Sequence, residues 1–275
     1  MNNNTLNNNN NVMNSVVLPP RLKDLCLWCT TFEDAYSHGA RQTTMYDLSG
    51  SGNNLTQDDS DHLPTFGTTS GQFGGRKVMK LTHPSGVASY IENTDIDVTS
   101  IFGDASSTTT DPEWTFVFVL NETANSLGTE KYFSLQGSGG QNDKLFLMRH
   151  AQGSGFRING NANYFDTSQI DFTQGTAVTS FNVCTDAGSD MTFEQWIGGV
   201  AADWDDTDVG TQYTVDPNTM FDAVGETVTC TIGAEMDESD MWYGEIAEIL
   251  LWKGAHTAAE RTETLNYLQD RWDCS

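Results

Sequence analysis

The segment from Trp242 to Trp272 constrains the fold of this chain more than any other. Gly244 opens a run dense in apolar residues, with the length and composition of a buried strand. Thr257 then stands three residues before Glu260, the spacing of a helix-starting capping box. We therefore expect a buried strand followed by one helix near 257–270. Four residues fall on one face of this helix, namely Ala258, Leu265, Leu268 and Trp272. The helix should dock through the last three of them.

Shorter apolar or alternating runs precede this segment and predict further strands. Trp114–Leu120 is apolar on both faces, which is typical of a central strand. The Gly and Ser stretches are short and spaced like turns, so no linker divides the chain. At 275 residues, one large all-β domain can bury a sizeable core without disulfides or metals. The other candidate strands are 132–136, 144–148, 177–183 and 228–232.

Three segments resemble concanavalin A-like (laminin-G-like) jelly-roll domains. Gly244–Trp252 and the helix after it are similar to the closing segment of that family, and Leu25–Ala35 is similar to its first strand. Tyr46–Asn54 is similar to its Trp-x-Asp-x-Ser-Gly-x-Gly-Asn turn, with Tyr46 in place of the usual Trp. The resemblance spans about residues 22 to 273. It implies an all-β, two-sheet antiparallel jelly-roll sandwich (concanavalin A-like) with a short C-terminal helix.

We divide the chain into an Asn-rich N-terminal arm, residues 1–21, and a jelly-roll domain, residues 22–275. Nine of the first fourteen residues are asparagine, a composition too polar to bury. The arm is interpreted either as a flexible tail or as a segment that orders on a neighbouring subunit. No basic start followed by an apolar run is present, so we expect no secretory signal peptide.

The charge balance excludes several partners. The chain carries 38 acidic and 13 basic residues, a formal net charge of −25. Such a surface repels phosphate backbones, so we expect no nucleic-acid partner. No apolar stretch approaches the length of a membrane span, so we expect no membrane partner either.

The five cysteines indicate buried thiols rather than a zinc site. Cys26 and Cys29 form a CxxC, but they lie in a predicted strand, where positions three apart should face opposite sides. An odd number of cysteines cannot all pair within the chain. The sequence leaves open whether Cys184 and Cys230 form a disulfide. Cys274 is the fifth cysteine.

No catalytic motif is complete. The segment Glu235–Asp240 approximates the Glu-x-Asp-x-Glu strand of glucanases of this fold, but Ser239 takes the fifth position. The histidines are scattered, and no GxSxG elbow occurs. We therefore expect no enzymatic activity, with a glycoside hydrolase as the weakest alternative.

One acidic loop is a candidate calcium site. Asp203, Asp205 and Asp208 supply closely spaced carboxylates, and Gly210 permits a turn. The expected cofactor is Ca²⁺, and a solvated turn is the alternative. A second, weaker cluster is formed by Asp58, Asp59 and Asp61.

Aromatic residues are candidates for sugar stacking, because sugar C–H faces pack on rings. Trp196, Trp204 and Trp242 lie near loop-like sequence and are the candidates. The tryptophans expected in the core are Trp28, Trp114 and Trp252.

The sequence favours a non-enzymatic virion structural or surface protein of a bacteriophage: a capsid decoration, fibre or tail component. This hypothesis rests on an adhesion-type fold without an export signal and on the polar arm. Its expected partners are other virion proteins, held through the arm, and host cell-surface glycans. We expect a homo-oligomer, located on the virion surface. The alternative is a free carbohydrate-binding lectin module, because this fold hosts many functions.

Overall fold

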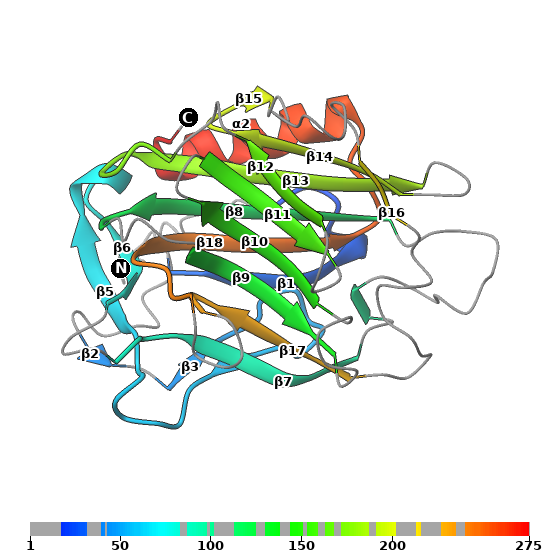
Figure 1. Cartoon of the computed structure of the whole chain (residues 1–275). Coiled ribbons are helices and arrows are strands. Elements are labelled where there is room, and N and C mark those ends of the chain that lie inside the picture. Colours follow the sequence, from blue (N-terminus) through cyan, green and yellow to red (C-terminus); the bar gives the residue numbers. More distant parts are fainter. Residues whose placement is uncertain are drawn as a thin grey trace, which may run out of the picture.

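The structure is a computed structural model in which two antiparallel sheets lie face to face as a β-sandwich, as the sequence predicts (Figure 1). It describes residues 18–31, 40–41, 43–82, 87–97, 100–101, 113–124, 130–137, 144–150, 153–158, 163–167, 172–186, 191–201, 213–215, 227–234 and 240–274.

Sheet A has ten strands in the described ranges, in the order β15-β14-β13-β8-β18-β6-β5-β2, with β1 beside β18 and β16 beside β14. Its strands are β1 (Leu25–Thr30), β2 (Ala40–Arg41), β5 (Thr65–Ser70), β6 (Arg76–Leu81), β8 (Trp114–Glu122), β13 (Ala177–Asp186), β14 (Met191–Ile197), β15 (Val200–Ala201), β16 (Tyr213–Val215) and β18 (Gly244–Lys253).

Sheet B has eight strands in the same part of the chain, in the order β12-β11-β10-β9-β17-β7-β4-β3. Its strands are β3 (Thr44–Met45), β4 (Leu55–Thr56), β7 (Ile91–Asp97), β9 (Glu130–Gln136), β10 (Lys144–His150), β11 (Gly153–Ile158), β12 (Asn163–Thr167) and β17 (Thr227–Ile232). Two short 3-10 helices in the described ranges are η1 (Leu22–Asp24) and η2 (Gly71–Phe73), and the α-helix α2 (Ala258–Trp272) follows β18.

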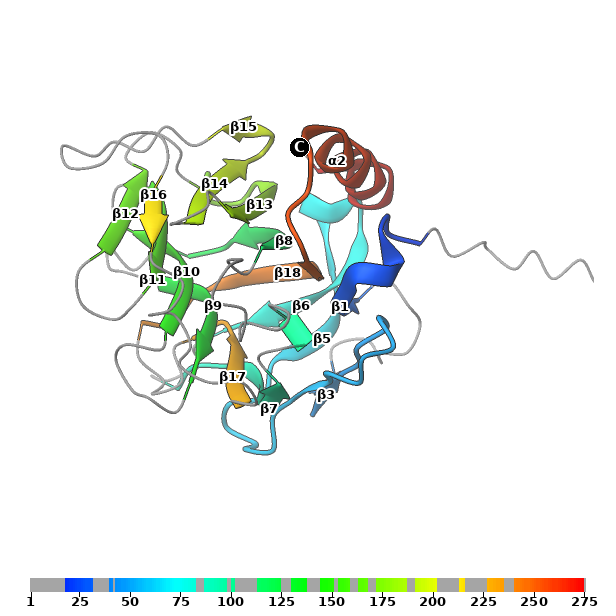
Figure 2. The same ribbon diagram turned by 90° about the vertical axis from the view of Figure 1, so that its right-hand side faces the viewer.

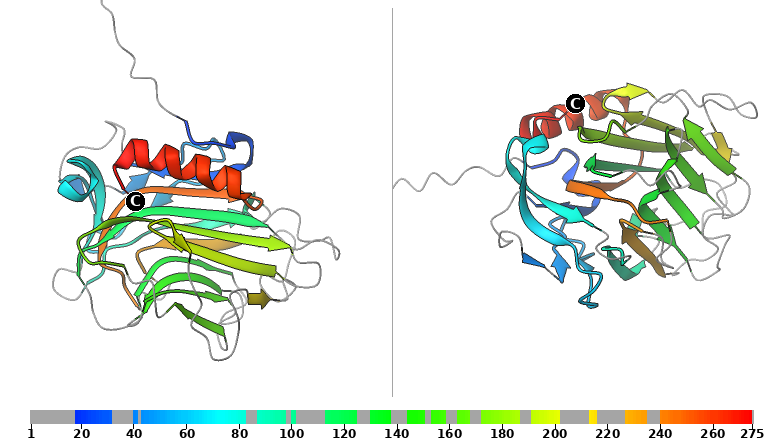
Figure 3. Two further views of the ribbon diagram at one scale, coloured as in Figure 1. Left: turned by 90° about the horizontal axis from the view of Figure 1, so that it is seen from above. Right: turned by 60° about the vertical axis from the view of Figure 1, so that its left-hand side comes forward.

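The centre of sheet A is buried on both faces, which explains why β8 and β18 carry apolar residues on both sides. Its inner face packs against sheet B through residues such as Phe118 and Ile249. Its outer face packs against α2 through Leu250 and Trp252. Figures 2 and 3 show α2 lying outside sheet A, on the side away from sheet B. The predicted central position of the Trp114 strand is confirmed, since β8 lies between β13 and β18.

Helix α2 begins as predicted. The amide of Glu260 donates to Thr257 Oγ1 at 3.3 Å, and the amide of Thr257 donates to Glu260 Oε2 at 2.8 Å, which completes the capping box. The predicted docking face is only partly correct. Leu268 and Trp272 are buried, Leu265 is partly buried, and Ala258 is exposed. The buried face is therefore rotated toward three other residues: Thr264, Tyr267 and Arg271.

The rotation is explained by a buried carboxylate on β18. Glu248 is fully buried and accepts hydrogen bonds at 2.7 Å from Trp28 Nε1 and from the Tyr267 hydroxyl, and a third from Trp272 Nε1. Arg271 Nε forms an ion pair with it at 3.2 Å. Burial raises the pKa of Glu248, while Arg271 and the three donors act in the opposite direction. The carboxylate thus fixes α2 on the sheet.

The turn at Tyr46–Asn54 is held by one carboxylate as well. Asp47 Oδ1 accepts from the amides of Trp28 and Ser49, at 3.0 and 2.9 Å. Asp47 Oδ2 accepts from the Ser49 hydroxyl and from the amide of Asn53, both at 2.9 Å. The acidic position of this motif therefore ties the turn to the edge of β1.

The prediction that Cys26 and Cys29 face opposite sides of a strand was wrong. A register shift between Leu25 and Leu27 places a bulge in β1. Both thiols consequently lie in the core between the sheets, together with Cys230. Burial raises the pKa of Cys26 to about 12, with coulombic repulsion from Asp47 as a smaller cause. All five cysteines are free and buried, so Cys184 and Cys230 are not bridged.

No helix within the described ranges has both the length and the apolar character that crossing a membrane requires.

Candidate functional site

The predicted calcium ligands Asp203, Asp205 and Asp208 lie outside the described residues, and the calcium site stays a prediction. The acidic segment at 235–239 also lies outside them. Asp240, which follows it, is described and forms an ion pair with Lys131 Nζ at 2.9 Å. Asp240 is therefore engaged in an ion pair.

The second acidic cluster forms a turn. The amide of Asp59 donates to Gln57 Oε1, and the amide of Asp61 donates to Asp59 Oδ1, each at 2.9 Å. Asp58 is exposed. Among the described residues, no three His, Cys, Asp or Glu side chains are grouped to hold a metal ion.

Two of the three tryptophans considered for sugar stacking, Trp196 and Trp242, do not present open rings. The guanidinium of Arg261 lies 3.7 Å from the ring centroid of Trp196 and covers it. Trp242 is 2% exposed and belongs to the inter-sheet core, while Trp204 lies outside the described residues. The expected core tryptophans, Trp28, Trp114 and Trp252, are confirmed as buried.

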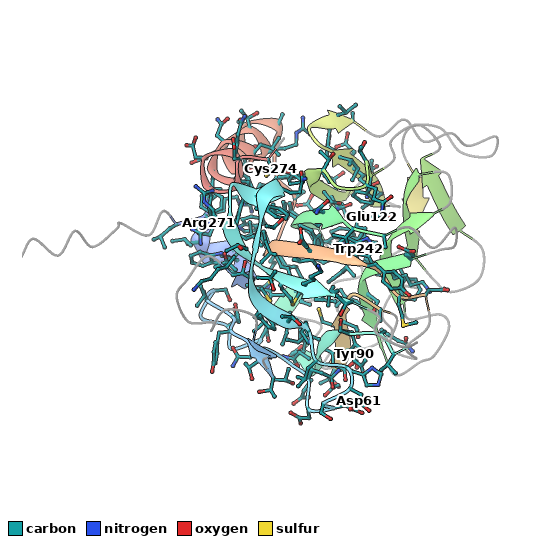
Figure 4. All side chains as sticks on the ribbon, turned by 90° about the vertical axis from the view of Figure 1, so that its left-hand side faces the viewer. Asp61, Tyr90, Glu122, Trp242, Arg271 and Cys274 are labelled. Atoms are coloured by element: carbon teal, nitrogen blue, oxygen red, sulfur yellow. The ribbon has the colours of Figure 1, made fainter. Side chains whose placement is uncertain are left out.

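A pocket of about 260 Å³ lies between η2, the start of β13 and the C-terminal end of α2. Figure 4 shows Cys274 at this end of the helix, next to the hairpin formed by β5 and β6. The pocket is lined by Gln72, Thr176, Ala177, Gln269, Asp273 and Cys274.

Local backbone features explain how three distant segments meet at the pocket. Ser70 caps η2, since its Oγ accepts from the amide of Gln72 at 3.3 Å. Gly74 and Gly75 have φ values of 61° and 76°, which allow the chain to turn into β6 directly after η2. Asp273 ends α2 in the left-handed region at φ 54° and donates its amide to Gln269 O.

A hydrogen-bonded carboxylate lies beside the pocket on the same outer face of sheet A. Glu245 Oε2 accepts from the Ser70 hydroxyl at 2.7 Å and from Asn121 Nδ2 at 2.8 Å. Asn121 is paired in register with Glu245 on one side and with Ala177, a lining residue, on the other. Asn121 is 2% exposed, and its Oδ1 has no hydrogen-bond partner among the described residues.

The lining is rich in hydrogen-bond acceptors. Asp273 contributes a carboxylate, and the C-terminal carbonyls of α2 add partial negative charge. Burial raises the pKa of the Cys274 thiol, so this group is neutral near pH 7; its hydroxyl neighbour Thr179 acts in the opposite direction. Two glutamines and Thr176 supply neutral donors. The arrangement suits a small ligand with several hydroxyl groups.

Two buried glutamates form a second candidate site at one end of the sandwich. Glu122 ends β8 and Glu130 begins β9, and each is 1% exposed. Glu122 lies opposite Gly244, where the Trp242 ring occupies the space that a Cβ atom would need. Figure 4 shows Glu122 and Trp242 close together. Burial raises the pKa of Tyr243, and the charge of Glu130 adds to this effect. Carboxylic acids at such positions can act as proton donors or bases.

Neither site has a local sequence motif. Gln72, Thr176 and Gln269 stand in three separate segments without a shared motif. Glu122 and Glu130 are visible only as acidic residues at the ends of predicted strands.

No family model and no curated protein matches this chain. Its fold is similar to that of several solved structures. An arabinofuranosidase in complex with arabinofuranosyl-alpha-1,2-xylobiose is 12% identical at a TM-score of 0.54, over 90% of this chain and 63% of that chain. Domain 4 of AbnA, a GH43 extracellular arabinanase from Geobacillus stearothermophilus, in complex with arabinotriose, is 13% identical at a TM-score of 0.53, over 88% of this chain and 97% of that one.

A third similar structure is the binding domain of Paraclostridial Mosquitocidal Protein 1, which is 12% identical at a TM-score of 0.53, over 90% of this chain and 53% of that chain. This chain thus spans less than two thirds of the arabinofuranosidase and of the mosquitocidal protein domain. At these identities the similarity establishes the fold alone.

These comparisons contradict two predictions from the sequence, the non-enzymatic virion protein and the absence of enzymatic activity. The chains that share the fold over most of its length include glycoside hydrolases and a domain bound to arabinotriose. The virion prediction depended on the polar arm and on the expectation that no export signal is present, and neither concerns the folded domain. The prediction of no activity depended on the broken motif at 235–240, on the scattered histidines and on the lack of a GxSxG elbow. Carboxylates can also be brought together from strand ends.

Proposed function

We propose that this chain is a concanavalin A-like β-sandwich that binds carbohydrate and holds one sugar ring in the pocket between η2, β13 and α2. The observation that carries the proposal is the lining of that pocket, which combines amide, hydroxyl and carboxylate side chains over an apolar base of Ala177 and Cys274. The similarity to a whole domain bound to arabinotriose supports it by analogy of fold.

The chemistry of the lining fits a sugar. Each glutamine amide can both donate and accept, which matches a hydroxyl group that also does both. The volume, about 260 Å³, is just below the roughly 300 Å³ at which pockets for drug-sized ligands begin, so it suits a single ring. The remaining units of a longer glycan would extend over the exposed rim, where Gln72, Thr176 and Gln269 lie.

Isothermal titration with arabinotriose tests this proposal. Ala177→Leu fills the base of the pocket, and Gln269→Ala removes a rim amide. We expect at least a tenfold loss of affinity for the first substitution and a smaller loss for the second. Asp58→Asn, an exposed change away from the pocket, serves as the control and should bind like the wild type. Equal affinity in the wild type and in Ala177→Leu would place binding elsewhere and refute the proposal.

Hydrolysis of a glycan is a second candidate function, favoured by the two glutamates at the end of the sandwich. Glycoside hydrolases use one carboxylic acid as proton donor and one carboxylate as nucleophile or base. Glu122 and Glu130 come from consecutive strands and are the residues that we assign to these roles.

Release of reducing ends from arabinan measures this activity. If the assignment is right, Glu122→Gln and Glu130→Gln each abolish hydrolysis, while the affinity for arabinotriose in the pocket is unchanged. Hydrolysis at the wild-type rate in both variants would exclude this pair, and its absence in the wild-type protein would exclude hydrolysis of arabinan.

A further inference from the structure

We propose that the N-terminal segment, residues 18–24, is a pH-sensitive attachment: Arg21 holds it on the connection between β18 and α2 at neutral pH, and protonation of His256 releases it. Figure 3 shows this segment beside the start of α2. The attachment is independent of the proposed carbohydrate binding, because neither Arg21 nor His256 lines the pocket.

Arg21 ties the segment to the domain. Its Nη1 donates to Ala255 O at 2.9 Å, and its Nε forms an ion pair with Glu260 Oε1 at 3.3 Å. The Pro20 carbonyl accepts from Trp252 Nε1 at 3.1 Å. The backbone of Arg21 is left-handed, at φ 52°, which costs free energy in a residue other than glycine. The side-chain contacts therefore hold the segment in a conformation that it would leave without them.

The contact between Arg21 and His256 requires a neutral imidazole. Arg21 Nη1 lies 3.2 Å from His256 Nδ1, and a guanidinium can only donate, so Nδ1 accepts and the ring proton is on Nε2. His256 Nε2 is buried and has no hydrogen-bond partner among the described residues. The ring is enclosed by Trp252 and Phe181, at 4.6 and 5.7 Å between ring centroids. Neither nitrogen thus faces an acceptor that would stabilise a second proton.

Protonation of His256 would place two donors and two positive charges against each other. The carboxylates of Asp24 and Glu260 favour the charged ring, but both are already paired with Arg21, which is in direct contact with the ring. The contacts of His256 with β8, β13 and β18 are to groups that do not titrate, namely Thr115, Phe181 and Trp252. Repulsion from Arg21 is therefore relieved when the segment moves away.

The direction of the pH dependence follows from the two states of His256. In the attached state burial, with the Arg21 charge second, lowers its pKa from 6.5 to about 4. In the released state Arg21 has left the ring, and the pKa rises toward 6.5. Because the released state binds the proton more tightly, the ratio of attached to released molecules falls as pH decreases from about 6.5 to about 4. The total fall is at most about 300-fold, or tenfold per pH unit.

Fluorescence anisotropy of a dye on the full chain tests the proposal. The dye is coupled to Leu18→Cys, because Leu18 is 53% exposed while all five native thiols are buried. We expect the anisotropy to fall between about pH 6.5 and about pH 4, as the segment gains motion of its own. Far-UV circular dichroism, measured in parallel, should stay constant over this interval. A simultaneous loss of both signals would show global unfolding in place of release and refute the proposal.

Two substitutions identify the groups responsible. His256→Gln keeps an acceptor for Arg21 but cannot gain a charge, so the fall in anisotropy should disappear or move at least one pH unit lower. Arg21→Met removes the contacts of the guanidinium, and its anisotropy should be low already at neutral pH. The matched control is His62→Gln, a histidine that contacts Ala88 O and Tyr90, and it should behave like the wild type.

Each remaining outcome contradicts one step. An unchanged fall in His256→Gln would assign the release to the carboxylates of Asp24 and Glu260. Constant anisotropy in the wild type down to about pH 4, with the domain folded, would show that the segment is not released. High anisotropy in Arg21→Met at neutral pH would show that Arg21 does not hold it. Any of these three results would overturn the proposal.

Discussion

Glu245 and Glu248 lie three residues apart on β18 and both point to the outer face of sheet A, yet their surroundings differ. Glu248 is closed in by Trp28, Tyr267 and Trp272, with Arg271 as its counter-ion. Glu245 has two donors, and one of them, Asn121, leaves an oxygen without a partner beside a pocket. The first arrangement holds the helix in place. The second links β18 to β8 and to the residue that caps η2.

Removal of Trp272, which packs α2 against sheet A, should have the largest effect on stability. Trp272→Ala removes a fully buried ring and a hydrogen-bond donor to Glu248. We expect a loss of about 5 kcal/mol in the free energy of unfolding, at the upper end of the range for buried aromatic residues. Urea denaturation measures it. Trp272→Phe retains most of the ring and should cost clearly less, and a loss below about 1 kcal/mol would show that the helix is not docked as described.

Neutralising the buried carboxylate should cost nearly as much. Glu248→Gln preserves the shape but leaves Arg271 buried without its counter-ion. Breaking a buried ion pair on one side costs about 3 to 5 kcal/mol. The double variant Glu248→Gln/Arg271→Met should recover part of this loss, since both members of the pair are then removed. Additive losses in the denaturation curves would mean that the two residues are not coupled.

A pH titration probes the segment between strand and helix. His256 packs against Trp252 at 4.6 Å between ring centroids, and burial, with the Arg21 charge second, lowers its pKa from 6.5 to about 4. Because the unfolded histidine binds a proton at higher pH than the folded one, the free energy of unfolding falls as pH decreases from about 6.5 to about 4. The loss through this group is at most about 3 kcal/mol. In His256→Gln the stability curve should be flatter over this interval, and an unchanged slope would assign the pH dependence to other groups.

The smallest effect on stability is expected for a substitution in the pocket. Asp273→Asn alters an exposed helix cap that Asn also tolerates, so the free energy of unfolding should change by no more than about 0.5 kcal/mol. Thermal denaturation checks this. A loss comparable with that of Glu248→Gln would mean that Asp273 also holds α2 on sheet A. Asp273 and Glu248 would then not differ in their structural role.

The sequence predicted the fold wherever the signal was local. The capping box at Thr257 located the helix start, and the apolar run after Gly244 located β18, because such patterns depend on neighbouring residues alone. The rotated docking face of α2 and the bulge at Cys26 were missed. Both depend on residues far apart in the chain: Glu248 selects the helix face, and pairing with β18 sets the bulge.

The candidate sites could not be predicted for the same reason. The pocket joins η2, β13 and the end of α2, which lie about a hundred residues apart from one another and share no motif. The calcium prediction at Asp203, Asp205 and Asp208 concerns a segment outside the described residues and needs a chelator experiment on the melting temperature.

The position of β18 also has a consequence for biosynthesis. This strand lies in the middle of sheet A, beside β8, β6 and β1, but it emerges from the ribosome long after all three. Pairing between β1 and β18 joins residues more than two hundred positions apart, as in Leu27 with Leu251. Until β18 arrives, the nascent chain has β8 with an open edge on the side where β18 will insert. Folding of this protein should therefore be slow and largely post-translational, and its newly made chains are natural clients of chaperones that shield unpaired strand edges.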